Sequence, residues 1–307
     1  MFPEEIYLEP TNFCNFKCIM CPHGYEGMVK NKGFMDYELF KKIIDDCRQY
    51  PGIILALHNM GESLLHPQIA DMCTYASKAG LKTMLHTNGS LLTPELSKRL
   101  VGSGLKKLSF SFEGEDALTY EKIRVNGIYK NVLDNILTFL EINQGKVTVT
   151  IQILRFNMND SLEPDAAFKE LFKKYKVNFY IYKTGSWKGD VKTHSAYRLA
   201  KKRFSPIVCP YYQRKMITIG WDGIVRGCCL DYNTENPLGD LKKSSVQDVW
   251  GGILRRTLGE KIAALQYDEI HLCRHCDAPY QIQEDDTNKY FEKAGVVKIG
   301  YRPALIE

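Results

Sequence analysis

Short apolar runs alternate with amphipathic stretches through the first two thirds of the chain, and this alternation limits the fold more than any other feature of the sequence. Six apolar runs have the length of buried β-strands. They cover residues 6–8, 53–57, 83–85, 108–112, 147–154 and 179–182. Strands that alternate with helices predict an α/β fold with a parallel sheet. Six such units are two fewer than a closed eight-stranded barrel needs, so the fold is either a partial (β/α)6 TIM-like barrel or an open sheet.

The stretches between the apolar runs have the spacing of amphipathic helices. They cover residues 37–47, 69–78, 94–101, 132–141 and 164–175. Asp36 and Thr93 stand directly before two of them and are typical residues at the start of a helix. Cys47 and Cys73 lie singly inside two of these helical patterns, and we expect both to be buried as small hydrophobic side chains.

Polar or glycine-containing clusters directly follow five of the six apolar runs. They are Glu9 to Cys14, His58 to Ser63, His86 to Gly89, Ser111 to Gly114 and Arg155 to Asn157. The carboxyl ends of parallel strands meet at one rim, where such folds bind their ligands. Any one cluster is explained by turn chemistry alone, since turns between strands and helices favour Gly, Asn and Ser. Their joint occurrence predicts a single site at that rim.

Three of the ten cysteines, Cys14, Cys18 and Cys21, form a C-x3-C-x2-C triplet after the first apolar run. Four-cysteine ferredoxin sites coordinate every iron of a four-iron cluster and carry electrons. A triplet supplies only three thiolates, so one iron remains open to a small molecule. The triplet therefore predicts an iron-sulfur cluster with a reactive iron.

The sequence favours a cytoplasmic protein. No apolar run approaches the roughly 20 residues of a membrane-spanning helix, and the acidic start, with Glu4 and Glu5, differs from a basic signal peptide. In a reducing compartment, clustered cysteines bind metals or act in catalysis more often than they form disulfides. The 44% of hydrophobic residues among 307 are enough for one large domain and one small domain.

A second cysteine set occupies the last third of the chain, with a predicted hairpin from Lys215 to Gly227 between its first members. The set consists of Cys209, Cys228, Cys229, Cys273 and Cys276. The spacing suits a zinc ion and an iron-sulfur cluster equally well. Four ligands complete such a site, so only one of Cys228 and Cys229 is needed. Because adjacent residues on a strand point to opposite faces, the spare cysteine packs inside the protein or, if it faces the substrate, donates a hydrogen atom.

The net charge of +5 does not by itself indicate a nucleic-acid partner. Basic residues concentrate between Lys169 and Arg203, where eleven Lys or Arg stand against two acidic residues. Such a run is most often the solvated face of a helix and a loop. The alternative is a basic wall that binds phosphate or carboxylate on a substrate.

The cysteine triplet at the first strand of a strand-helix repeat resembles the signature of the radical S-adenosylmethionine (radical SAM) superfamily. The resemblance implies a partial barrel in which Cys14, Cys18 and Cys21 hold a [4Fe–4S] cluster whose open iron binds S-adenosylmethionine. It also implies that one electron, from a donor such as flavodoxin or ferredoxin, cleaves this cofactor to a 5'-deoxyadenosyl radical. That radical would abstract hydrogen from a substrate, while the protein positions and shields the reacting groups.

The segment Met60-Gly61-Glu62 is similar to the family's Gly-Gly-Glu motif, with methionine in place of one glycine. The resemblance implies that its carbonyls and carboxylate hold the methionine ammonium of the cofactor. Further residues occupy cofactor-lining positions on later strands, namely Thr87, Asn88, Ser111, Glu113 and Asn157. Met20 stands where the family usually has an aromatic residue near the adenine, and a thioether can take that place.

The pattern Cys209-x13-Gly223-x4-Cys228 resembles the opening of the SPASM and twitch auxiliary domains. The resemblance implies one auxiliary [4Fe–4S] cluster, held by Cys209, by Cys228 or Cys229, and by Cys273 and Cys276. The shorter twitch type is expected, because no further cysteines follow Cys276.

Three domain ranges follow from these assignments. They are a barrel over residues 1–200, an auxiliary-cluster domain over 201–281 and a tail over 282–307. A helical segment from Ser244 to Leu258, which includes Trp250, is expected to pack within the auxiliary domain as core and surface.

The reaction is less constrained than the family. One hypothesis is an oxidoreductase that converts a secondary alcohol of a small polar molecule, with or without a phosphate group, to a ketone. The molecule would be a sugar, aminocyclitol or nucleotide. Its proton acceptor would be Lys183, Tyr182, His194 or Arg155, which the sequence does not rank. The alternative is a peptide-modifying enzyme, an epimerase or cross-linking maturase. The early first strand is expected to leave no room for the leader-binding domain that many peptide-modifying relatives carry, which favours the small-molecule hypothesis. A zinc-binding interaction protein with an inert first triplet is the non-enzymatic alternative.

Overall fold

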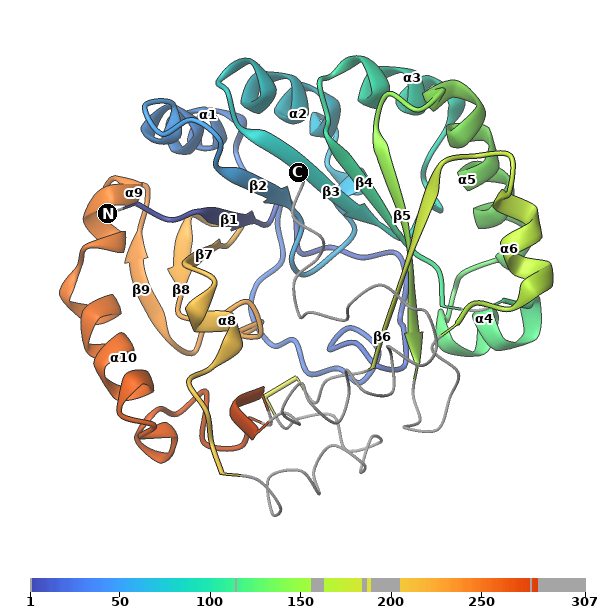
Figure 1. Cartoon of the computed structure of the whole chain (residues 1–307). Coiled ribbons are helices and arrows are strands. Elements are labelled where there is room, and N and C mark those ends of the chain that lie inside the picture. The colour runs from blue at the N-terminus through green and yellow to red at the C-terminus, as the bar shows by residue number, and fades with distance from the viewer. Residues whose placement is uncertain are drawn as a thin grey trace.

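The computed structural model describes residues 2–113, 115–155, 163–183, 187–188, 205–276 and 278–280. Within them, nine strands form one sheet in the order β6-β5-β4-β3-β2-β1-β7-β8-β9, as Figure 1 illustrates. The strands are β1 (Glu5–Leu8), β2 (Ile54–Leu57), β3 (Lys82–Thr87), β4 (Lys107–Ser111), β5 (Thr148–Arg155), β6 (Val177–Lys183), β7 (Met216–Ile219), β8 (Ile224–Arg226) and β9 (Pro237–Asp240). All six predicted strands are present.

Helices cover the outer face of the curved parallel part of the sheet (Figure 1). They are α1 (Tyr37–Cys47), α2 (Ile69–Lys78), α3 (Pro94–Gly102), α4 (Ala117–Ile123), α5 (Tyr129–Asn143) and α6 (Ala166–Phe172). The later elements are α8 (Pro210–Gln213), α9 (Val246–Trp250), α10 (Ile253–Ala263) and the single turns η1 (Ser63–Leu65), η2 (Tyr267–Glu269) and η3 (Ala278–Tyr280). Five of the first six helices match the predicted amphipathic stretches.

The predicted helix starts are confirmed by their capping hydrogen bonds. Oδ1 of Asp36 accepts from the backbone N–H of Leu39 at 2.9 Å, and Oγ1 of Thr93 accepts from that of Leu96 at 3.2 Å. Each cap satisfies one of the free N–H groups in the first turn of a helix. As expected, the side chains of Cys47 and Cys73 are fully buried within α1 and α2.

Two helical predictions differ from the structure. Helix α4 was not predicted, although Asp116 caps it. The helix has only seven residues, and one of its apolar side chains, Leu118, points into solvent. Its sequence therefore lacks a clear amphipathic pattern. The segment from Ser244 to Leu258 contains two helices rather than one. Gly251 ends α9 and Gly252 begins α10, because glycine disfavours the helix interior.

The sheet continues beyond the barrel into the last third of the chain. Strands β1 to β6 pair in parallel, and β7 adds to the other edge of β1, also in parallel, with Leu8 beside Ile219. Strands β8 and β9 then follow as antiparallel neighbours. The fold class is confirmed, and the sheet runs across the predicted domain boundary at residue 200. No helix in the described part of the chain is long and apolar enough to cross a bilayer.

Candidate active site

The first cysteine triplet lies in the loop after β1, and the end of α4 fixes its backbone. The N–H of Lys17 donates to the carbonyl of Val125 at 3.0 Å, and that of Ile19 donates to the carbonyl of Ile123 at 3.1 Å. Within the loop, the N–H of Cys21 donates to the carbonyl of Cys18 at 3.0 Å. The unpredicted helix α4 therefore anchors the loop that carries the three thiols.

Arg124 connects the same loop with the end of β4. Its Nη1 lies 3.2 Å from Sγ of Cys18, and two other guanidinium nitrogens bond both carboxylate oxygens of Glu113, which is buried. Bidentate pairs of this kind combine charge attraction with fixed geometry. The sequence analysis named Glu113 but missed Arg124, whose only signal was its position just after a capped helix.

The turn formed by Met60, Gly61 and Glu62 packs directly on the cysteine loop. The N–H of Glu62 donates to the carbonyl of Phe13 at 2.8 Å. Gly61 has φ +90°, and a Cβ at this position would lie 2.5 Å from the carbonyl oxygen of Thr11 and 2.6 Å from that of Phe13. Only glycine combines this backbone conformation with so close an approach.

The carboxylate of Glu62 is buried among neutral donors. Its Oε1 accepts from Oγ1 of Thr87 at 2.7 Å and from the N–H of Leu64 at 3.0 Å, and its Oε2 accepts from the N–H of Asn88 at 2.7 Å. Burial raises the pKa of Glu62 above its usual range, although these hydrogen bonds oppose the shift. A carboxylate has about four acceptor sites, so this one has room for a further donor. The ammonium group of S-adenosylmethionine fits such a position, because its charge would offset the buried carboxylate.

The remaining predicted cofactor residues occupy varied surroundings. Asn88 uses its side chain to bond Asn15 of the cysteine loop at 3.0 Å. Ser111 ends β4, Met20 is buried within the cysteine loop and Met60 is buried. Asn157 lies outside the described residues. The structure thus brings Glu62, Thr87 and Asn88 together beside the cysteine loop.

Burial raises the pKa of Cys14 and of Cys21 to about 12. Cluster binding requires thiolates, so loading this site must release protons. Among the described residues, no three His, Cys, Asp or Glu side chains converge tightly enough to hold a single metal ion. The thiolates of an iron-sulfur cluster bind different irons and need no such convergence.

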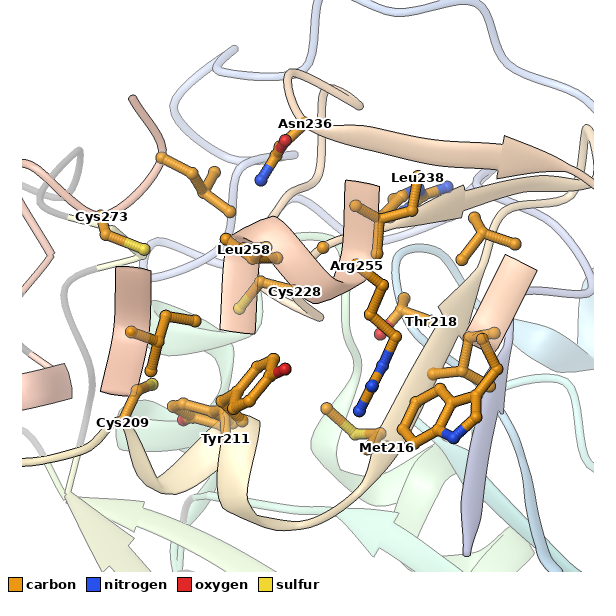
Figure 2. A pocket seen from close by; sticks show the side chains of 18 of the residues that line it. Cys209, Tyr211, Met216, Thr218, Cys228, Asn236, Leu238, Arg255, Leu258 and Cys273 are labelled. Atoms are coloured by element: carbon orange, nitrogen blue, oxygen red, sulfur yellow. The ribbon is translucent and has the colours of Figure 1, made fainter. Parts of the chain in front are cut away.

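Three members of the second cysteine set line a pocket between α8, α10 and the β7–β8 hairpin. Figure 2 shows Cys209, Cys228 and Cys273 with their sulfur atoms directed toward the space between them. Cys276 packs in the same buried cluster, and its N–H donates to the carbonyl of Cys273 at 3.0 Å. Burial raises the pKa of Cys273 to about 12 and of Cys209 to about 11. The donor set fits an iron-sulfur cluster.

Cys229 has different neighbours from Cys228. It does not line the pocket. It lies close enough to Tyr7 of β1 to contribute to the raised pKa of that phenol, about 12, for which burial is the main cause. The two adjacent thiols lie just beyond β8 and are hydrogen-bonded to each other, and of the two only Cys228 lines the pocket.

Residues 8–167 match the family model of the radical SAM superfamily. The chain belongs to the radical SAM superfamily. Residues 209–277 match the SPASM model, described as an iron-sulfur cluster-binding domain. Enzymes of this superfamily use S-adenosylmethionine and a [4Fe–4S] cluster, and the SPASM domain binds auxiliary iron-sulfur clusters, which are therefore the cofactors of this chain.

Known proteins similar to this chain cover several activities. The cofactor-modifying protein for tungsten-containing aldehyde ferredoxin oxidoreductase of Pyrococcus furiosus is 24% identical over 290 residues, or 80% of each chain. BtrN, solved with AdoMet and 2-DOIA, aligns with a TM-score of 0.61 and 17% identity over 90% of this chain and 93% of its own. Streptococcus suis SuiB, solved with the precursor peptide SuiA, aligns with a TM-score of 0.65 and 13% identity over 84% and 67%. The structural similarities establish a shared fold.

Among the predicted proton acceptors, only Arg155 has a described side chain. Its Nη2 lies 2.9 Å from Oε1 of Glu115, so the guanidinium is engaged in an ion pair at the end of β5. The side chains of Tyr182 and Lys183 and the whole of His194 lie outside the described residues. All four assignments stay predictions.

Proposed function

We propose that this radical SAM enzyme oxidises a secondary alcohol of a small polar substrate, such as a sugar, aminocyclitol or nucleotide, to a ketone. The observation that carries the proposal is the polar interior of the barrel, next to the turn formed by Met60, Gly61 and Glu62 (the cofactor turn). Strands β1, β3, β4 and β5 carry Tyr7, His86, Ser109 and Gln152, each directly after a buried apolar residue. In a closed barrel whose interior is only packed core, branched apolar side chains fill these inward positions. Polar side chains there favour a hydrophilic ligand.

The roles of the chain's own residues follow from their surroundings. Cys14, Cys18 and Cys21 would hold the cluster, and Glu62 would hold the cofactor ammonium, with Thr87 and Asn88 fixing its carboxylate. When bound, the cluster and S-adenosylmethionine supply a radical that abstracts a hydrogen atom from substrate. Arg124 places a cation beside Cys18, where it would stabilise the negative charge of a cluster.

Cys209, Cys228, Cys273 and Cys276 would hold the auxiliary cluster, which supplies an electron acceptor for a two-electron oxidation. The shared pocket of Cys209, Cys228 and Cys273 supports Cys228, rather than Cys229, as the fourth ligand. The proposed domains are residues 1–200, which would hold the first cluster, residues 201–281, which would hold the auxiliary cluster, and a tail of residues 282–307. Strand β7 of the second domain pairs with β1 of the first.

The basic stretch gives limited support to an anionic substrate. Lys169, Lys173 and Lys174 form ion pairs with acidic side chains on the surface, which favours the solvated-face interpretation for α6. Lys188 lies 2.6 Å from Glu235. The stretch from 189 to 203 lies outside the described residues. A phosphate or carboxylate on the substrate therefore stays a prediction.

The test uses anaerobically reconstituted enzyme with S-adenosylmethionine, a reductant and a panel of sugars, aminocyclitols and nucleotides. The expected result is a substrate that loses two mass units while one equivalent of 5'-deoxyadenosine forms. The Cys14→Ala variant, which cannot hold the first cluster, is the control and should give neither product. Cofactor cleavage with no two-unit loss from any panel member would contradict the proposed oxidation.

A second candidate function, epimerisation within a peptide, is favoured by one observation. Cys229 lies near Tyr7, which the strand alternation directs to the inside of the barrel. A thiol in that position could return a hydrogen atom to a substrate radical. Reaction in heavy water separates the two functions, because epimerisation adds one deuterium at a peptide carbon and oxidation adds none. Loss of that deuterium uptake in Cys229→Ala would support epimerisation over oxidation.

A further inference from the structure

Two histidines form a stacked pair inside the barrel. His86 belongs to β3, and His58 directly follows β2. Their ring centroids are 3.8 Å apart with an angle of 27° between the planes. The ring of Tyr7 packs edge-on against His58 with 4.8 Å between centroids. The pair is therefore held in a fixed orientation by its own contacts.

The strand register directs this pair inward. Phe110 contacts Phe139 of helix α5, so it faces the helix-covered side of the sheet. Successive side chains on a strand alternate between the two faces. Ser109 of β4 therefore points to the opposite side, and its partner in register, His86, points with it. The last register pair of β2 and β3 is Leu57 with Leu85, so the next residues, His58 and His86, lie beside each other.

The pair lies close in sequence to the cofactor turn on both strands. His86 directly precedes Thr87 and Asn88, which bond the carboxylate of Glu62. His58 precedes Met60 by two residues. A ligand on the imidazoles would thus lie inside the barrel beneath the residues assigned to S-adenosylmethionine.

Three polar atoms of this cluster are buried without a hydrogen-bond partner among the described residues. They are Nδ1 of His58, Nε2 of His86 and Oγ of Ser109. Buried polar atoms in folded proteins are nearly always hydrogen-bonded, because an unpaired one costs about 1–3 kcal/mol. Three unpaired atoms on adjacent strands, all on the inward face, indicate a place for a ligand rich in hydrogen-bonding groups.

The two imidazoles are neutral near pH 7. Burial, with a contribution from Lys107, lowers the pKa of His86 to about 3, and burial lowers that of His58 far below its usual range. Gln152 hydrogen-bonds the His86 side chain and opposes this shift, as an acceptor from an imidazole N–H does. That bond leaves Nε2 of His86 as the nitrogen with a free lone pair. The cluster thus offers an uncharged acceptor at His86, with Nδ1 of His58 and the hydroxyl of Ser109 beside it, and such a set suits hydroxyl groups better than an anionic group.

Arg214, a cation that acts on both histidines, is already paired with a carboxylate. Arg214 bonds the carboxylate of Glu5 and lies 3.0 Å from the hydroxyl of Tyr7. Its charge is therefore balanced within the barrel by Glu5. The stacked rings and Ser109 bring three unpaired polar atoms into one small region, which suits a ligand with neighbouring hydroxyl groups.

We propose that His58, His86 and Ser109 bind adjacent hydroxyl groups of an uncharged, polyhydroxylated ring, with Nε2 of His86 accepting a hydrogen bond from one of them. This inference rests on the proposed function and names the part of the substrate that enters the barrel. A peptide segment fits the cluster less well, since each backbone unit offers a single N–H donor, whereas each hydroxyl group both donates and accepts.

The test measures binding to the holoenzyme with S-adenosylmethionine and without reductant, so that no oxidation can occur. Histidine labelled with 15N reports on the two rings by NMR. Titration with myo-inositol, the probe for adjacent hydroxyls, is expected to shift the His58 and His86 signals. The His86→Phe variant should bind at least about tenfold more weakly, since a polar site rejects a ligand that leaves its groups unpaired. His271→Phe, an exposed position, should bind as the unaltered protein does.

Unmoved histidine signals at saturating myo-inositol, or equal affinity in His86→Phe, would overturn the proposal. So would shifts produced by N-methylacetamide, a peptide mimic, with none from myo-inositol. If His86→Phe does not fold, Ser109→Ala removes a hydroxyl without removing a packed ring, and it should weaken binding about threefold or more. Intact myo-inositol binding with no ketone from any panel substrate would contradict the proposed oxidation and leave this binding site standing.

Discussion

Nη2 of Arg226, on β8, lies 2.7 Å from Oε1 of Glu9, the residue after β1, and both side chains are fully buried. Glu9 also pairs with Lys30 at 3.2 Å and accepts from the backbone N–H of Met60 at 3.2 Å. Burial alone would raise the pKa of Glu9, but Arg226 and Lys30 outweigh it and hold that pKa below its usual range. The carboxylate of Glu9 therefore joins the β7–β8 hairpin to the turn formed by Met60, Gly61 and Glu62.

Neutralising Glu9 should cost more stability than neutralising Arg226. Glu9→Gln leaves two cations without their partner, and removing one partner of a buried pair costs about 3–5 kcal/mol. Arg226→Met leaves Glu9 still paired with Lys30, so its loss should be smaller. Urea unfolding of the two single variants and the double variant gives the three free energies, and the double variant should lose less than the sum of the singles.

The exposed ion pair between Lys130 and Asp134 provides the control. Asp134→Asn should change the free energy of unfolding by no more than about 0.5 kcal/mol. Equal losses for Asp134→Asn and Glu9→Gln would mean that the buried carboxylate does not stabilise the junction.

Gly61→Ala should disrupt cofactor binding. The added Cβ would meet backbone oxygens of Thr11 and Phe13, which cannot move without displacing the loop of Cys14. We expect S-adenosylmethionine affinity to fall at least about tenfold, a loss of about 1.4 kcal/mol, in equilibrium binding to the reconstituted protein. Gly80 is the matched control, because it has the same φ of +90° and nothing within 4 Å of a Cβ. Gly80→Ala should keep normal affinity, and a comparable loss there would assign the effect to backbone strain alone.

Cys228→Ala and Cys229→Ala should differ in iron content. Two four-iron clusters give about eight irons per chain, and loss of the auxiliary cluster leaves about four. We expect about four in Cys228→Ala, because Cys228 shares the pocket with Cys209 and Cys273, and about eight in Cys229→Ala. Iron and sulfide analysis after anaerobic reconstitution checks this, and the reverse result would make Cys229 the ligand.

Replacing Arg124 should lower the reduction potential of the first cluster. Its guanidinium contacts Sγ of Cys18, and hydrogen bonds to cluster sulfurs and nearby positive charge favour the reduced state. Arg124→Met removes both effects, and Arg124→Lys restores the charge. A redox titration followed by electron paramagnetic resonance should give the lowest potential for Met and an intermediate one for Lys. An unchanged potential in Arg124→Met, with the cluster present, would exclude this role.

Stability should fall on acidification below pH 6.5. Burial lowers the pKa of His86 from 6.5 to about 3 and that of His23 from 6.5 to about 4. Between these values the unfolded chain binds protons that the folded chain does not, so the free energy of unfolding rises with pH across this window and levels off above it. Urea unfolding at a series of pH values measures the slope, and His86→Phe should reduce it. A slope unchanged by that variant would show that His86 titrates normally.

The local parts of the fold could be predicted from the sequence. The strand at Ile6 to Leu8 and the caps Asp36 and Thr93 depend on neighbours in the chain, and periodicity and turn chemistry report these directly. Three of the strand-end clusters also meet, since Thr87 and Asn88 bond the carboxylate of Glu62, whose N–H bonds Phe13 of the cysteine loop.

The long-range parts could not be predicted. The pairing of β7 with β1 and the contact of Arg226 with Glu9 join residues more than 200 positions apart, and no local pattern encodes such a partner. The sequence left open which of Cys228 and Cys229 belongs with the other cysteines, and only the fold assigns Cys228 to their pocket. The stacking of His58 on His86 could not be predicted either, because the two residues belong to different strand-end clusters and only the register of β2 and β3 brings their rings together.

The position of β1 between β2 and β7 has a consequence for synthesis on the ribosome. The first strand emerges early, yet the strand that covers its second edge begins at Met216. Until then, β1 presents a row of unpaired backbone groups, which is a template for pairing with other chains. A nascent or truncated chain that ends before Met216 should therefore aggregate or exchange strands, and chaperone protection would matter most during this interval.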